Sequence, residues 1–182
     1  AYLVSTQTPG MSALQFQRQL GLSRYETAFQ LLHKLRAGMI RPDHDSIGDP
    51  WPVEVDEAFI GGKTKGKGRG VTDAPLVIAA VEVRTRVTPK KGRRVVYAGR
   101  LRLRQIVSRE RAELEPFVKD NVLVNSIVRT DGWQGYDYLG AFGYQHEPLV
   151  VSGNAELLDK HLPMVHIVFS NLKTWLRGTH HG

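Results

Sequence analysis

Residues 53–60 read VEVDEAFI, and at this stretch the sequence changes its periodicity. Apolar and charged side chains alternate along it, which predicts a half-buried strand. Counting it as the first strand, the predicted order downstream is β-β-β-α-β-α-β-α. The further elements expected are strands at 75–84 and 94–103, a helix at 109–120, a strand at 126–130, a helical turn region at 132–143, a strand at 144–151 and closing helices at 155–162 and 165–177.

This order of elements is that of an RNase H-like, retroviral-integrase-like α/β fold, so we predict a mixed sheet with flanking helices. In that fold, phosphodiester chemistry uses acids on the first strand, at the end of the fourth strand and on a late helix. Asp56 lies in the middle of the first predicted strand, and Asp131 ends the fourth. Their carboxylates would suit divalent cations, which take hard oxygen ligands. Taken singly, each is more simply explained as a strand or turn residue; the two positions together favour the site.

Upstream of the first strand, residues 11–37 predict two helices separated by a short glycine-containing turn. Ser23 and Glu26 match the capping-box pattern at the start of the second helix. Helix, turn and helix form the outline of a DNA-binding motif, although helical hairpins that only pack are commoner. The domains expected are a helix-turn-helix-like segment at 1–42, a linker at 43–52 and a catalytic domain at 53–182.

Positive charge is concentrated in the middle of the 182-residue chain, whose net charge is +7. Residues 61–104 hold 13 of the 25 basic residues and only two acidic ones. Such a patch suits a polyanion such as DNA, because phosphate contacts release condensed counterions; the alternative is a solvated surface. The candidate phosphate contacts in this segment are Lys63, Lys65, Lys67, Arg69, Lys90, Lys91, Arg93 and Arg94.

The chain contains no cysteine, which excludes a disulfide framework, a cysteine-ligated metal and a thiol nucleophile. The longest apolar runs are far shorter than the roughly 20 residues that span a bilayer, so no membrane partner is expected.

The last predicted helix has one polar face. At about 100° per residue, His166, Ser170, Lys173 and Arg177 fall on the same side, opposite an apolar stripe. Asn171 lies near the border, roughly 140° from His166. A histidine in an arbitrary helix is usually structural, but this one shares its face with a lysine seven residues later.

Four stretches in one order resemble the DDE-type transposases of bacterial insertion sequences, in the ISXO-like group: VEVDEAFIGGKTKGKG, SIVRTDGWQGYDYLG, GYQHEPLVV and VHIVFSNLKTWLRGTHHG. The resemblance implies an RNase H-like fold, a divalent metal (Mg²⁺ or Mn²⁺), and DNA cleavage and strand transfer at transposon ends. It carries the two catalytic aspartates onto Asp56 and Asp131. The third family residue varies among Glu, Asn and His. Its usual spacing from a basic residue assigns it to His166 with Lys173, and Asn171 is the competing assignment.

The resemblance also implies partners. Asp56, Asp131 and His166 would hold the metal, and Lys173 and Arg177 would contact phosphates of double-stranded DNA at transposon ends and target. A homo-oligomer in the bacterial cytoplasm, at the nucleoid, is expected. Members commonly carry an N-terminal cysteine-rich zinc ribbon and continue beyond GTHHG, so we expect this chain to be truncated at both ends. The alternatives are an inactive remnant that only binds DNA and an RNase H-like nuclease without strand transfer.

Overall fold

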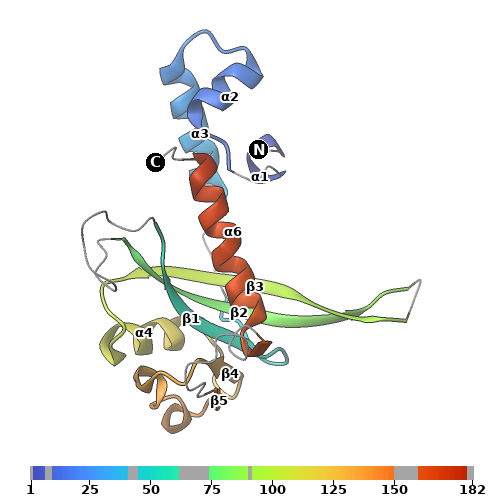
Figure 1. The fold of residues 1–182 in the computed structure, drawn as a ribbon, viewed down its shortest axis with the longest axis vertical. Helices are drawn as coiled ribbons and strands as arrows, with labels where there is room; N and C mark the ends of the chain where they lie inside the picture. The colour runs from blue at the N-terminus through green and yellow to red at the C-terminus, as the bar shows by residue number, and fades with distance from the viewer. Residues whose placement is uncertain are drawn as a thin grey trace. The chain divides into compact units, whose positions relative to one another are not determined.

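The computed structural model describes residues 2–6, 10–40, 45–61, 74–89, 92–149 and 160–179 (Figure 1). The chain divides into two compact units, one formed by Asp45–Phe169 and the other by Ala1–His44 with Ser170–Gly182. The elements in chain order are α1 (Tyr2–Thr6), α2 (Ala13–Leu20), α3 (Tyr25–Gly38), β1 (Val53–Phe59), β2 (Leu76–Val87), β3 (Arg94–Ile106), α4 (Arg111–Asn121), β4 (Ile127–Thr130), the 3₁₀ turns η1 (Gln134–Tyr136) and η2 (Gly140–Phe142), β5 (Gln145–Pro148) and α6 (Pro163–Thr179).

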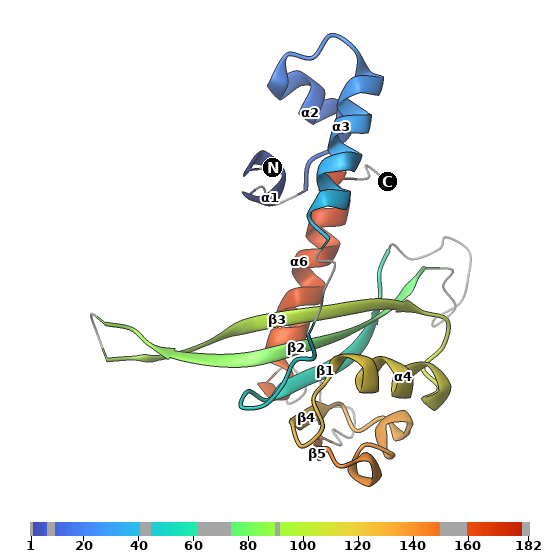
Figure 2. The same cartoon turned by 180° about the vertical axis from the view of Figure 1, so that it is seen from behind.

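The larger unit is built on a five-stranded mixed sheet in the order β3-β2-β1-β4-β5. β1 pairs antiparallel with β2, and β2 with β3, whereas β4 runs parallel to both β1 and β5. Val53 pairs with Val128, so the strand that contains Asp56 and the strand that ends just before Asp131 are neighbours. The mixed α/β architecture is confirmed. Figure 2 shows that the β2–β3 hairpin extends well beyond the other strands.

The faces of β1 separate its apolar residues from two of its acidic ones. Val53 and Val55 are fully buried in a core with Leu114 and Phe117 of α4. Because side chains alternate along a strand, Glu54 and Asp56 occupy the opposite face. Burial of such large apolar side chains stabilises the fold, and truncating a residue like Phe117 typically costs about 3–5 kcal/mol. The packing of Val53 and Val55 into this core therefore fixes the position of β1 in the larger unit.

The helical unit has its own small core of Met11, Phe16, Ala28 and Leu32, which confirms two helices within residues 11–37. Ser12 caps α2 by accepting a hydrogen bond from the Gln15 N–H at 3.2 Å.

The predicted capping box at the start of α3 is wrong. The helix begins at Tyr25, and Arg24 occupies the N-cap position without a side-chain capping bond. Ser23 and Glu26 keep the right spacing, but both stand one position too early for the reciprocal bonds.

Some expectations fall on residues that the structure does not describe. These are the glycine-rich loop with Lys63, Lys65, Lys67 and Arg69, the hairpin residues Lys90 and Lys91, and most of the predicted helix at 155–162. Within the described ranges, none of the helices combines the length and the apolar character that a membrane span needs.

Candidate active site

The sheet brings Asp56 and Asp131 together. Asp56 pairs through its backbone with Ala79 near the middle of the sheet, and Asp131 directly follows the last residue of β4. One carboxylate oxygen from each of Asp56, Glu57 and Asp131 lies within 4.8 Å of the others. Asp56 and Glu57 are buried and Asp131 is half-buried. Three carboxylates this close repel one another, and a bound cation would relieve that repulsion.

Glu57 also belongs to this cluster, and it was not among the site residues predicted from the sequence. The Tyr136 hydroxyl donates to its Oε2 atom at 2.6 Å, and Arg109 Nε lies 3.2 Å from its Oε1 atom. Burial raises the pKa of Glu57 to about 7; the neighbouring Asp56 adds to this, whereas the Tyr136 hydrogen bond and Arg109 oppose it. Strand alternation alone would place Glu57 on the face opposite Asp56, so the alternating pattern does not predict that their carboxylate oxygens come within 4.8 Å of each other.

His166 lies beside Asp56, with 3.3 Å between His166 Nε2 and Asp56 Oδ2. The first turn of α6, the helix that carries His166, is bound by another acidic residue of β1. Glu54 Oε2 accepts hydrogen bonds from the backbone N–H groups of Met164 at 2.7 Å and Val165 at 2.8 Å. First-turn amides have no partner within their own helix, so this buried carboxylate satisfies two of them.

Burial raises the pKa of Glu54, and the two amide hydrogen bonds act in the opposite direction. β1 thus holds the start of α6 with one acid and places the next acid on that face beside His166. The spacing of Glu54 and Asp56 in the sequence VEVD predicts that both side chains lie on the same face of the strand.

The other candidate residues lie outside the carboxylate cluster, and most of them are exposed. Asn171 is exposed, Lys173 is half-buried and Arg177 is exposed, all on the part of α6 that groups with the helical unit. Arg93 and Arg94 are exposed at the β2–β3 hairpin. The carboxylate cluster itself comprises Asp56, Glu57 and Asp131.

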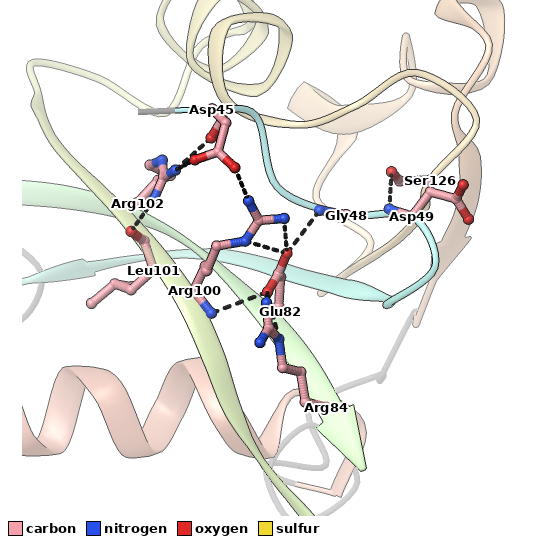
Figure 3. Close-up of polar contacts among 9 residues, drawn as sticks. All are labelled: Asp45, Gly48, Asp49, Glu82, Arg84, Arg100, Leu101, Arg102 and Ser126. Atoms are coloured by element: carbon pink, nitrogen blue, oxygen red, sulfur yellow. Dashed lines mark hydrogen bonds and ion pairs between the residues drawn. The ribbon is translucent and has the colours of Figure 1, made fainter. Parts of the chain in front are cut away.

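Several arginines of the basic segment bind carboxylates of the chain itself (Figure 3). Glu82 is fully buried on β2 and accepts hydrogen bonds from Arg84 Nε at 2.8 Å, Arg100 Nε at 2.9 Å, the Arg100 backbone N–H at 3.1 Å and the Gly48 N–H at 3.2 Å. Burial alone would raise the pKa of Glu82, but these hydrogen bonds outweigh it and lower the pKa to about 2. Asp45 in turn binds Arg100 and Arg102. Two carboxylates thus offset two of these three positive charges within the chain.

Comparison with known proteins identifies the family. A family model described as the ISXO2-like transposase domain matches residues 48–182, most of the chain. The chain belongs to this family. No curated protein and no solved structure matched it.

The match confirms the resemblance, the RNase H-like fold and a transposase role. Membership in this transposase family also implies DNA binding and the use of a divalent metal. The matched range contains Asp56, Asp131 and His166.

Proposed function

We propose that this transposase domain cuts DNA at the ends of an insertion sequence and joins the freed 3′-hydroxyl to target DNA in a metal-dependent reaction. The observation that carries the proposal is the meeting of Asp56 and Asp131 at neighbouring parallel strands, with oxygens within 4.8 Å of each other. Two strands that are distant in sequence supply the hard ligands that Mg²⁺ and Mn²⁺ prefer.

The donor set fits a divalent cation. Asp56 and Asp131 would hold it through oxygen, and His166, beside Asp56, would complete the site. When bound, such a cation activates the attacking oxygen and neutralises charge that develops on the phosphate. Because imidazole is a softer donor without negative charge, His166 favours Mn²⁺ relative to an all-carboxylate site. Asn171 is the alternative third residue.

The basic residues would hold the DNA. Lys173 and Arg177 would contact DNA phosphates, and the exposed Arg93 and Arg94 would contact the duplex backbone. The lysines and the arginine at 63–69, with Lys90 and Lys91, extend that contact surface. In this proposal the helical segment at 1–42 lies on the transposon end, and the active form is a homo-oligomer.

The test is cleavage of a labelled transposon end by the Asp56→Asn and Asp131→Asn variants. Each should lose activity on the order of 100-fold or more, because each removes a charged metal ligand. Asp137→Asn is the matched control, since Asp137 is an exposed aspartate of the following turn. An undiminished rate in either site variant would refute the proposal.

Two further measurements refine the assignment. His166→Ala should abolish cleavage and Asn171→Ala should not; the reverse result would move the third ligand to Asn171. Products in which transposon and target strands are joined distinguish a transposase from a nuclease without strand transfer.

A further inference from the structure

We propose that Glu57, Tyr136 and Arg109 form a positioning cluster that fixes the separation of Asp56 and Asp131. The inference rests on the proposed metal site and adds residues that act on it indirectly. Asp56 and Asp131 come from different elements, so something must hold those elements in register. Metal ligands need such support, because their geometry must be held within about 0.5 Å.

The first contact joins the strand to the loop after Asp131. Glu57 follows Asp56 directly in β1, and Tyr136 lies in η1, five residues after Asp131. The Tyr136 hydroxyl donates to Glu57 Oε2 at 2.6 Å, and the Tyr136 side chain is fully buried. A hydrogen bond between buried groups fixes both partners, because water cannot replace either one. The loop is therefore tied to β1 one residue away from Asp56.

The second contact passes through Arg109, just before α4. Its side chain pairs with Glu57 Oε1 at 3.2 Å, while its backbone carbonyl accepts the Trp133 indole N–H at 2.9 Å. The backbone N–H of Trp133 donates to Asp131 Oδ1 at 3.0 Å. A continuous line of contacts thus runs from Glu57 through Arg109 and Trp133 to Asp131.

Close packing at Gly135 supports this arrangement. A Cβ atom at Gly135 would lie 2.9 Å from the Arg109 carbonyl oxygen and 2.9 Å from the Trp133 side chain. The loop after Asp131 therefore fits against Arg109 only with glycine at that position.

Glu57 acts as a positioning residue in this scheme because both of its oxygens face protein partners. Oε2 accepts from Tyr136, and Oε1, which is buried and makes no hydrogen bond within the described part of the chain, forms an ion pair with Arg109, a cation that would compete with a metal for that oxygen. Asp56 and Asp131 remain as the metal-binding carboxylates. Loss of a partner that is bonded directly to a ligand typically weakens metal binding about 10–100-fold. Tyr136 and Arg109 reach Asp131 only through other residues, so we expect a loss at the lower end of this range.

The test is Mn²⁺ binding to the full chain without DNA, measured by electron paramagnetic resonance or calorimetry. Tyr136→Phe should weaken Mn²⁺ binding about 10-fold and raise the Mn²⁺ concentration for half-maximal cleavage by the same factor. Tyr144→Phe is the matched control, since it removes a buried tyrosine hydroxyl that donates to the Val122 carbonyl at 3.2 Å. It should bind Mn²⁺ like the wild type.

Substitutions of Glu57 separate positioning from direct ligation. Glu57→Gln keeps an oxygen for Tyr136 and should bind Mn²⁺ about 10-fold more tightly than Glu57→Ala. Equal losses in both variants would make Glu57 a ligand and overturn the proposal, as would wild-type affinity in Tyr136→Phe. If Tyr136→Phe does not fold, Arg109→Lys provides the same test at a half-exposed side chain and should also weaken Mn²⁺ binding.

Failure of the underlying function has a different signature. Wild-type protein that binds no Mn²⁺ would overturn the metal site and this proposal together. Wild-type binding that is unchanged in Tyr136→Phe and Arg109→Lys would overturn the positioning cluster alone.

Discussion

Replacing Glu82 with glutamine should destabilise the larger unit mainly by removing one buried negative charge. Glu82 accepts four hydrogen bonds from Arg84, Arg100 and Gly48, and glutamine keeps its shape without its charge. The pKa falls from its usual 4.5 to about 2 in the folded chain. At 1.36 kcal/mol per pKa unit, this corresponds to about 3 kcal/mol of stability at neutral pH. We therefore expect Glu82→Gln to lower the free energy of unfolding at pH 7 by about that amount.

The pH dependence has a defined sign. A depressed carboxyl pKa stabilises the fold above the unfolded pKa near 4.5, and this contribution is lost as the pH falls toward 2. The difference between wild type and Glu82→Gln should therefore shrink between pH 4.5 and pH 2.

Urea unfolding followed by tryptophan fluorescence at pH 7 and at pH 2.5 measures both quantities. Glu115→Gln, which alters a glutamate paired on the surface with Arg111 and Lys119, is the control and should have a much smaller effect. A cost below about 0.5 kcal/mol at pH 7, or an equal cost at both pH values, would refute the reasoning.

The other predictions concern the same strands and the segment that leads into them. Gly48→Ala should destabilise the unit by about 1–3 kcal/mol in thermal unfolding, because Gly48 has φ +127° and a Cβ there would lie 2.1 Å from Ser126 Oγ; an unchanged melting temperature would contradict this. Arg93→Glu with Arg94→Glu should reduce the salt dependence of DNA binding by about one slope unit per lost phosphate contact, measured by fluorescence anisotropy. Arg84→Gln should leave that slope unchanged, because the Arg84 guanidinium is held against the buried Glu82; equal slopes in all three proteins would show that the hairpin does not contact DNA.

The fold was predictable because its signals are local. Period-two alternation and near-continuous apolar runs indicate strands even where the exact ends of the strands are not predicted. The order of the elements then predicts that the strands of Asp56 and Asp131 are neighbours, as they are in the structure. The capping error at Ser23 shows the limit of local patterns, since a shift of one residue leaves the motif intact in sequence and breaks it in space.

The partners of the acids were not predictable in the same way. Gly48 and Glu82 are 34 residues apart, and Glu57 and Tyr136 are 79 residues apart. Such pairs depend on tertiary packing that periodicity does not encode. A basic segment read from composition alone looks available to DNA, whereas Arg84 and Arg100 are bound to a buried carboxylate. The sequence gives the number of basic residues, but the tertiary structure determines which of their side chains are available to bind DNA.

The three acidic residues of β1 make the domain sensitive to changes in the length of this strand. Glu54 holds the start of α6, Asp56 faces His166, and Glu57 receives Tyr136 from the loop after Asp131. Because strand faces alternate, deleting or inserting one residue within VEVDEAF exchanges the faces of every side chain beyond it. Inserting or deleting one residue there would therefore disrupt several of the contacts of Glu54, Asp56 and Glu57 at once. A point substitution would disrupt only the contacts of the residue replaced. Natural variants of this domain should therefore tolerate exchanges within β1 far better than changes in its length.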